Sequence, residues 1–313
     1  MPFTWQYDAT TGTYKSHALS NDVRFAAIEA TTFFEHVKAE SGFGKRMGES
    51  VTIPRISNLI EPTSAQLSET TQIPEDVFAM SVKTITAKEL GRKVSWTQWG
   101  EMLASFDLPD AIVTKLRQQM TLVLDSISAT AAKRAKVRFT PTGVSSYTAT
   151  SNGTFGATAS VNIGVYHLSQ IHDLLYDTYK APYADQDAYI GIFRQLAVRG
   201  VMDDPNWEKW HQYTDPQSKY HGEAGMIDRI RIVRTNHANA LGKVGTGSVL
   251  GEGIVMGADA LAMAEVLTPE IRQGIPQDLG RSRLAGWYGG LEVDLVWDTA
   301  NPGEANILYV GSL

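Results

Sequence analysis

The sequence contains no cysteine, and that absence excludes a whole set of chemistries. Disulfide frameworks, thiolate zinc sites, iron–sulfur clusters and cysteine nucleophiles all require thiols. Basic residues are in the minority, with 28 Lys and Arg against 34 Asp and Glu, for a formal net charge of -6. A protein that mainly wraps nucleic acid by neutralising phosphates has the opposite balance, so we expect any basic surface here to be local.

Long apolar runs are also missing. No segment of the 313 residues approaches the roughly 18 consecutive apolar residues of a membrane-spanning helix. Residues 1–8 lack the basic segment and apolar core of an export signal, so we expect a soluble chain with no membrane partner. No internal repeat of about 20 to 50 residues is visible, which argues against solenoids and propellers. The length predicts about two domains, or one large composite domain.

Familiar catalytic motifs are absent as well. The chain has no phosphate-binding loop, no His-Glu-x-x-His, no Gly-x-Ser-x-Gly and no acidic calcium loop. The glycine-rich stretch 245–253 has the wrong spacing for a dinucleotide fingerprint and indicates a flexible loop. His167 and His172 lie on different faces of a predicted helix, so they do not form a shared metal site. We therefore predict no catalytic residue, no metal and no cofactor.

One enzyme hypothesis stays open. It is an α+β enzyme whose pocket, or metal site, is built from acidic and histidine side chains in a loop-rich stretch: His211, Asp215, His221 and Glu223.

The N-terminal segment is unusual for a free tail. Residues 1–24 show no sustained period but carry four large aromatic side chains: Phe3, Trp5, Tyr7 and Tyr14. Such side chains lose their transfer free energy in water, so we expect this arm to fold back on the chain or to dock on another one. Apolar residues at helical spacing then predict a helix over 23–38.

Two strands with a long loop come next. Ser50–Ile56 and residues 77–86 alternate apolar and polar residues as half-exposed strands do. Pro54 restricts the first strand to a sheet edge. The polar residues 57–76 join the two, which predicts a protruding hairpin. Because two-stranded ribbons are marginal in water, this one needs a partner surface.

The strongest periodic signal is a long amphipathic helix. Pro109 sits in its first turn, and apolar residues step by threes and fours to about Lys136, for a length of about 42 Å. Four cations crowd its C-terminal end: Lys133, Arg134, Lys136 and Arg138. Cations there complement the helix macrodipole, and a patch facing nucleic acid is the alternative.

The remainder mixes strands and helices without strict alternation, which predicts an α+β fold. A hairpin within 139–163 is expected to turn at Asn152 and Gly153. The other predicted elements are a helix from Val165, a strand at 189–192, a partly helical segment at 196–213, strands at 227–235 and 254–257, a short helix at 258–266, and a terminal hairpin of 291–298 with 307–310.

The order of these parts, together with short motifs, resembles a known family. The motifs are 42–54 (GFGKRMGESVTIP), 87–97 (AKELGRKVSWT), 203–207 (DDPNW), 220–227 (YHGEAGMI), 231–239 (RIVRTNHAN) and 255–260 (VMGADA). Over about residues 25 to 310 they resemble the major capsid proteins of tailed double-stranded-DNA phages, with the Hong Kong 97-type or Johnson fold. Within these, the chain is similar to the coliphage N-four-like podovirus family. One departure is Phe193-Arg194-Gln195, where that family is expected to have His-Pro.

The resemblance implies a division of the chain. Its parts would be an N-terminal arm and short helix (1–47), an extended loop (48–95), a peripheral domain (96–184) with a spine helix at 108–138, an axial domain (185–265), and a return to the peripheral domain (266–313).

The resemblance also implies a structural function. The protein would assemble with itself into hexamers and pentamers of an icosahedral head around double-stranded DNA, which would meet its inner face. Scaffolding, portal and decoration or cement proteins would be further partners. Assembly would occur in the host cytoplasm, and the mature location would be the virion. An encapsulin-like shell around a protein cargo is the alternative. The candidate interface residues are Phe3, Trp5, Tyr7, Arg46, Arg55, Lys83, Lys88, Arg92, Trp96, Trp207, Glu223 and Asn239.

Overall fold

The computed structural model describes residues 29, 31–40, 48, 50–59, 61–62, 66–67, 69, 72–104, 106–185, 187–203, 223–243 and 249–313. The predicted aromatic arm lies outside these residues. So do residues 23–28 and 30 of the predicted helix over 23–38, residues 245–248 of the glycine-rich stretch, and the part of the 196–213 segment beyond residue 203.

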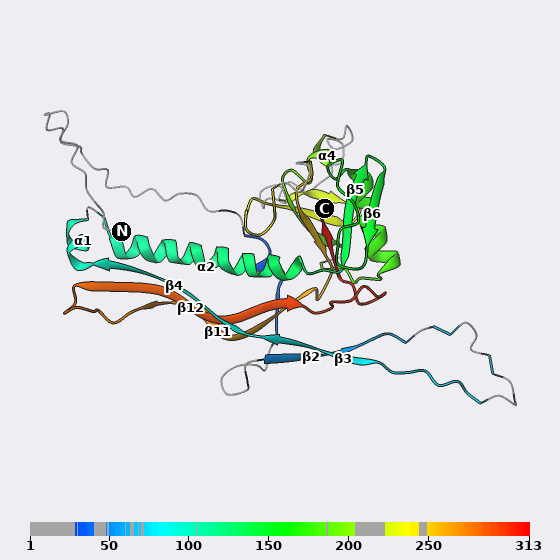
Figure 1. The fold of residues 1–313 in the computed structure, drawn as a ribbon, viewed down its shortest axis with the longest axis horizontal. Coiled ribbons are helices and arrows are strands. Elements are labelled where there is room, and N and C mark those ends of the chain that lie inside the picture. The colour runs from blue at the N-terminus through cyan, green and yellow to red at the C-terminus, as the bar shows by residue number, and fades with distance from the viewer. Residues whose placement is uncertain are drawn as a thin grey trace.

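The chain forms a long lobe, a compact lobe and a ribbon (Figure 1). In the long lobe, helix α2 (Leu108–Ala132) lies along a four-stranded sheet with the order β1-β11-β12-β4, and a short helix follows β4 at the far end. These elements are β1 (Lys38–Ala39), β4 (Lys88–Thr97), α1 (Gln98–Leu103), β11 (Leu261–Gln273) and β12 (Ser282–Leu295).

The compact lobe is built on a seven-stranded mixed sheet with the order β6-β5-β13-β10-β7-β9-β8. Its strands are β5 (Val137–Gly143), β6 (Ser146–Thr150), β7 (Tyr189–Arg194), β8 (Glu223–Ile227), β9 (Ile230–Thr235), β10 (Gly253–Met256) and β13 (Ile307–Val310). Helix α3 (Val165–Asp173), the π-helical turn Leu174–Thr178 and the short α4 (Arg199–Met202) complete it. The α+β fold predicted from the sequence is confirmed.

The predicted protruding hairpin is also confirmed. Strand β2 (Ser50–Ile56) pairs antiparallel with β3 (Met80–Thr86), from Ser50 opposite Thr86 to Ile56 opposite Met80. The loop between them extends away from both lobes. We call the two strands the ribbon.

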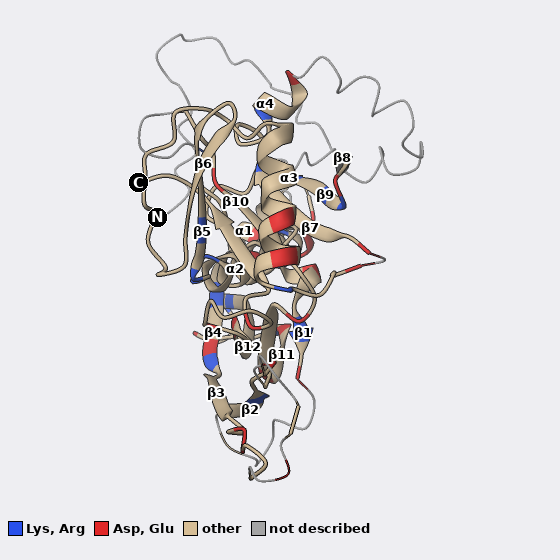
Figure 2. Ribbon diagram, turned by 90° about the vertical axis from the view of Figure 1, so that its right-hand side faces the viewer, with Lys and Arg blue, Asp and Glu red and all other residues tan. Residues whose placement is uncertain are grey.

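The long lobe has three layers, which are visible end-on in Figure 2. Helix α2 packs Leu116, Ile112 and Met120 against Trp287 of β12 on one face of the sheet. The base of the ribbon packs on the opposite face, where Ile85 meets two small residues of β11, Ala262 and Ala264. The ribbon base is therefore held by the same sheet that supports α2.

Both faces of the seven-stranded sheet are buried, and neighbouring residues on each strand alternate between them. One face, with Tyr189 and Phe193, packs against helix α3. The other face, with Ile190, Ile192 and Ile254, joins a second core that contains the C-terminal half of α2 and the adjacent ends of β11 and β12. This second core is the contact between the lobes, and we call it the joint.

Helix α2 begins as predicted but ends earlier. The Asp107 side chain caps its N-terminus by accepting a hydrogen bond from Asp110 N at 3.1 Å. The helix ends at Ala132 and not near residue 138. Val137 and Phe139 are fully buried in β5, which pairs in parallel with β13. The residues predicted as the last turn of the helix therefore belong to the sheet.

Two predicted helices are wrong where the structure describes them. In the 23–38 region the chain makes one 3-10 turn at Phe34–His36 and then β1, because the amides of residues 32–34 bond to the side chain of Asp125 and not to a helical ladder. Residues 258–266 turn at Asp259, with φ of 49°, and then enter β11. Pairing with β1 and β12 overrides the helix propensity of the Ala, Leu and Met residues there.

One predicted turn is misplaced, and one predicted strand is interrupted by a turn. The hairpin after α2 turns at residues 144–145, and Asn152 and Gly153 form a separate turn in which Asn152 Oδ1 accepts from Thr154 N at 3.0 Å. The predicted strand 227–235 is split into β8 and β9 by Asp228 and Arg229, both with positive φ.

The predicted terminal hairpin is wrong as a whole. Strand β12 belongs to the long lobe, whereas β13 lies between β5 and β10 in the compact lobe. Among the described helices, none is both long and apolar enough to cross a membrane.

A close approach of strands explains one glycine in the compact lobe. Gly253 of β10 lies opposite Phe193 of β7, and a Cβ atom at Gly253 would overlap the Phe193 ring. The neighbouring Gly191 leaves room for the same ring, since a Cβ there would approach Phe193 Cε2 to 2.5 Å.

We expect Gly253→Ala to lower the free energy of unfolding by about 1–3 kcal/mol, because the new methyl group overpacks a full core. Gly290→Ala in β12 is the control, since its nearest side-chain neighbour, Leu267 Cβ, would be 3.8 Å away. Urea denaturation followed by circular dichroism measures both. Equal midpoints for the two variants would contradict this account.

Candidate functional site: the joint and the exposed elements

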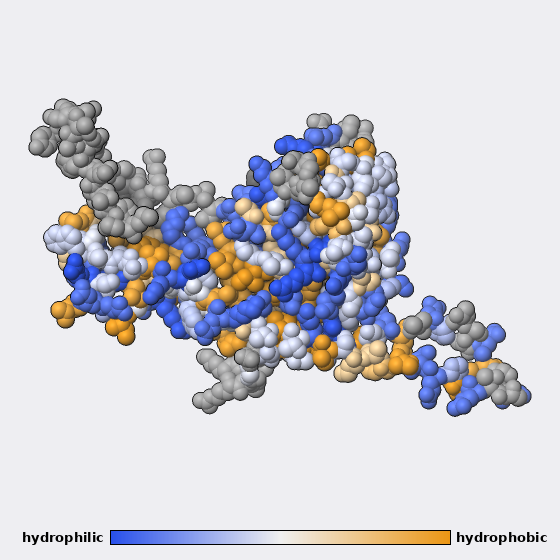
Figure 3. Space-filling model, in the orientation of Figure 1, coloured by the Kyte–Doolittle hydropathy of each residue, from blue (hydrophilic) through white to orange (hydrophobic). Residues whose placement is uncertain are grey.

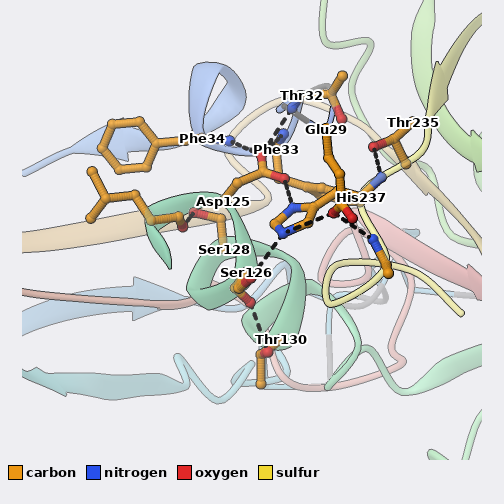
Figure 4. Close-up of polar contacts among 12 residues, drawn as sticks. Glu29, Thr32, Phe33, Phe34, Asp125, Ser126, Ser128, Thr130, Thr235 and His237 are labelled. Carbon is orange, nitrogen blue, oxygen red and sulfur yellow. Dashed lines mark hydrogen bonds and ion pairs between the residues drawn. The ribbon is translucent and has the colours of Figure 1, made fainter. Parts of the chain in front are cut away.

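The joint contains a fully buried carboxylate in the middle of helix α2. Asp125 Oδ1 accepts hydrogen bonds from the backbone N–H groups of Thr32 at 2.9 Å, Phe33 at 2.7 Å and Phe34 at 3.4 Å. Its other oxygen, Oδ2, accepts from His237 Nδ1 at 2.7 Å. Asp125 is 0% exposed and His237 is 1% exposed, so these donors take the place of water around the charge (Figure 4).

His237 has further polar neighbours besides Asp125. His237 Nε2 lies 3.4 Å from Ser126 Oγ and 3.7 Å from Glu29 Oε2. Glu29 Oε2 also accepts from Ala238 N at 2.9 Å, and His237 N donates to Thr235 Oγ1 at 3.2 Å. Residues 29–34, helix α2 and the loop after β9 therefore meet at one polar centre.

A second polar group at the joint is centred on Glu252. Its carboxylate accepts from Lys133 Nζ, Gly242 N and Tyr309 OH, each at 2.6 Å. Burial alone would raise the pKa of Glu252, but these hydrogen bonds outweigh burial and lower that pKa below its usual range. Burial and the bond to Glu252 raise the pKa of Tyr309, which keeps its hydroxyl protonated as a donor.

The cations at the C-terminal end of α2 make contacts at this joint. Lys133 binds Glu252, and Arg134 Nη1 lies 3.2 Å from Asp294 Oδ1 of β12. The Arg138 guanidinium lies over the Tyr309 ring, 4.5 Å from its centroid. Three of the four cationic side chains thus have partners within the chain, whereas Lys136 is exposed and its backbone oxygen accepts a hydrogen bond from Gly153 N at 2.9 Å. These contacts favour a structural role for the cations over the alternative of a patch that faces nucleic acid.

Those predicted interface residues that the structure describes lie in several different parts of the molecule. Phe3, Trp5, Tyr7, Arg46 and Trp207 lie outside the described residues, as do His211, Asp215 and His221 of the enzyme hypothesis. For Glu223 the structure describes the backbone in β8.

The remaining candidates are spread over the surface. Trp96 Nε1 donates to Glu101 Oε2 at 2.9 Å at the far end of the long lobe, and Lys88 pairs with Glu292 at 3.2 Å. Arg92 and Asn239 are exposed, on β4 and on the loop after β9 respectively.

Two candidates, Arg55 and Lys83, fasten the ribbon to the body of the chain. Arg55 Nη1 donates to Asp298 Oδ1 at 2.6 Å and to Val296 O at 3.1 Å. Lys83 Nζ lies 3.1 Å from Asp294 Oδ2 and 3.4 Å from Asp298 Oδ2. Burial alone would raise the pKa of Asp298, but the hydrogen bond from Arg55 and the charge of Lys83 outweigh it and lower that pKa.

Sequence reasoning did not identify the Asp125–His237 pair. The available signal was a carboxylate next to Leu124 and near Ile127, on the apolar face of the predicted helix, where an unpaired charge is costly. His237 was noted only within the motif 231–239. Nothing in the sequence shows that these two residues, 112 positions apart, come together.

The Asp298 contacts predict a pH-dependent stability. A pKa that is lower in the folded than in the unfolded chain stabilises the fold above the ordinary carboxyl pKa, and this contribution is lost as the pH falls through the folded pKa. We expect the difference in unfolding free energy between wild type and Asp298→Asn to be largest above about pH 5 and to shrink below about pH 4.

Chemical denaturation at a series of pH values measures this difference. Asp278→Asn is the control, since Asp278 is an exposed aspartate at the turn after β11 and pairs only at 3.9 Å with Arg281. A difference for Asp298→Asn that stays constant between about pH 6 and pH 3.5 would show that Asp298 is not held as a charged partner.

Comparison with known proteins gives a clear result at the level of the fold. No protein-family model matches the chain, and no curated protein matches its sequence. In three dimensions the chain is similar to the capsid of the cyanophage P-SCSP1u, with a TM-score of 0.69 and 13% identity over 95% of this chain and 92% of that one. It is equally similar to the capsid of the cyanophage Pam1, with a TM-score of 0.69 and 14% identity over 99% of each chain.

A third match is the acid-stable capsid of the Helicobacter pylori bacteriophage KHP30. The TM-score is 0.67 and the identity 12%, over 100% of this chain and 99% of that chain. Identities this low do not test the finer likeness to coliphage N-four-like proteins. The matches cover nearly the whole of each chain, and the protein therefore has the Hong Kong 97-type fold of tailed-phage capsid subunits.

Proposed function

We propose that this chain is a major capsid protein, which assembles with itself into the hexamers and pentamers of an icosahedral phage head. The observation that carries the proposal is the match along the whole chain to subunits of phage capsids. The matched structures are phage heads, which favours a shell around DNA over an encapsulin-like shell around protein. The function is structural, and we assign no catalytic role.

The outer face of the ribbon supports self-association. Ile56 and Pro54 lie opposite Met80 and Val82, and Ile56, Met80 and Val82 are each more than half exposed. Their neighbours Arg55 and Ile85 point the other way, into the body of the chain. A strand pair with an apolar face in solvent is a typical surface for another protein.

A second apolar surface lies at the far end of the long lobe, and Figure 3 shows hydrophobic residues gathered there and along the ribbon. It consists of exposed side chains from α1, its C-terminal flank and the turn between β11 and β12: Trp99, Met102, Leu103, Phe106, Ile275 and Leu279. We call this surface the tip. Trp99 is 69% exposed, which is unusual for a tryptophan with no role in binding.

The two surfaces lie at opposite ends of the molecule, so a copy cannot cover its own tip with its own ribbon. Head-to-tail contacts form closed rings when the rotation between neighbouring copies closes, and a capsomer is such a ring. Charge is complementary as well, because residues 57–79 contain four acidic and no basic residues, whereas β4 exposes Arg92 and Lys93 near the tip. We propose that the ribbon of one copy lies against the long lobe of the next.

The remaining expectations belong to this proposal. They are the domain limits at 48, 96, 185 and 266, the coliphage N-four-like subgroup, contact of the inner face with double-stranded DNA, partnership with scaffolding, portal and decoration proteins, assembly in the host cytoplasm and location in the virion. The arm residues Phe3, Trp5 and Tyr7, with Arg46, Trp207, Glu223 and Asn239, are proposed as further contacts between subunits.

The test is assembly of the purified protein, with and without a scaffolding partner, followed by electron microscopy and sedimentation. We expect closed particles or rings from the wild type. Val82→Asp on the ribbon and Trp99→Asp at the tip are each expected to reduce assembled protein at least about tenfold, because burying an unpaired charge costs several kcal/mol.

Val144→Asp is the matched control. Val144 is an exposed valine in the turn between β5 and β6, away from both surfaces, and this variant should assemble like the wild type. A wild-type protein that stays a compact monomer under every condition would overturn the proposed function.

A further inference from the structure

The Asp125 centre links three chain segments in a closed circuit (Figure 4). Residues 32–34 bond to α2 through Asp125 Oδ1. Helix α2 bonds to the loop after β9 through Asp125 Oδ2 and His237 Nδ1. That loop bonds back to the first segment through Ala238 N and Glu29 Oε2. Each segment therefore holds the other two.

We propose that this circuit is a latch, in which the binding of residues 32–34 to α2 and the position of the loop after β9 are energetically coupled through Asp125 and His237. It connects helix α2 of the long lobe to the loop after β9 in the compact lobe. It goes beyond the proposed function, because it concerns the single subunit and does not require a shell.

The first argument is the concentration of donors on one buried carboxylate. Asp125 accepts hydrogen bonds from four N–H groups and is 0% exposed. If one donor leaves, three remain, and the buried carboxylate is less well solvated. A buried charge with fewer donors favours conformations that admit water, and water can reach Asp125 only if its backbone partners move away. Loss of His237 should therefore weaken the bonds that Asp125 makes to residues 32–34.

The second argument is that the described part of the segment has only short regular structure, although Phe34 and Val37 pack on the joint core and β1 pairs with β11. Phe33 is buried in the joint core, but Phe34–His36 is a single 3-10 turn and β1 spans two residues. Short elements with few contacts open with small free energies. Helix α2 and strands β7, β10 and β13 are instead held by the continuous cores on both sides of the compact sheet.

The third argument is the charge around the imidazole. Among the described residues, the charged groups within ion-pair distance of His237 are Asp125 of α2 and Glu29 of the N-terminal segment, at 2.7 Å and 3.7 Å. Both are carboxylates, and each comes from a different partner segment. The ring therefore bridges the two segments and does not belong to either one.

The test is hydrogen–deuterium exchange of the unassembled protein, read at the amides of Thr32, Phe33 and Phe34. Asp125→Asn keeps an acceptor oxygen but removes the charge, and we expect exchange at these amides to be at least about fivefold faster. His237→Ala is the decisive variant, because His237 does not touch these amides. We expect it to accelerate their exchange at least about fivefold as well, while exchange in the middle of α2 and in β10 stays near the wild-type rate.

His172→Gln is the matched control, since His172 is a partly buried histidine of α3 that contacts Tyr183 in the compact lobe. It should leave the amides of residues 32–34 unchanged. If His237→Ala folds poorly, His237→Gln, which retains an amide donor, gives the same reading with a smaller effect. A double-mutant cycle of Glu29→Gln with His237→Gln should give effects that do not multiply.

Two results would overturn the latch. One is normal exchange at residues 32–34 in the His237 variants, which would make the bonds to Asp125 independent. The other is equal acceleration throughout α2 and β10, which would make His237 a general stabiliser of the fold. Failure of assembly in the electron microscope would instead count against the proposed function and would leave these exchange rates unaffected.

Discussion

The structure depends on one constraint, which is that both faces of the seven-stranded sheet are apolar. Residues such as Tyr189 and Phe193 need α3 on one side, and their neighbours Ile190 and Ile192 need an equal cover on the other. The C-terminal half of α2 and the ends of β11 and β12 supply that cover. The lobes are therefore joined by a core and not by a flexible linker, because separating them would expose an entire sheet face to water.

Burial in the joint removes water from Asp125 and most of the water from Glu252, and this explains the arrangement of their partners. Asp125 and Glu252 are each surrounded by donors from separate parts of the chain, so neither carboxylate is left uncompensated. Buried polar networks are stabilising only when every member is satisfied. The same requirement makes them specific, since the donors are in place in one arrangement of the lobes.

The ribbon and the tip differ from the joint, because they leave apolar side chains exposed. The ribbon base is held by Arg55, Lys83 and Ile85, but its outer face and the tip remain apolar in solvent. Large apolar side chains exposed in this way are typical of surfaces that another protein covers, which supports the proposed self-assembly. The absence of cysteine fits this reading, because cohesion between copies would come from interlocked area and not from disulfides.

The sequence by itself determined the α+β class, the ribbon and the start of α2, because periodicity and turn chemistry act within a short stretch of chain. The capsid-type fold was predicted from a resemblance in the order of short motifs. Tertiary structure alone decided where α2 ends, why residues 258–266 form a strand, and why the last two strands enter different sheets. It also decided that Asp125 meets His237. In each case the deciding bond comes from residues far away in the sequence, and local propensity, worth less than about 1 kcal/mol per residue, cannot compete with a buried partner.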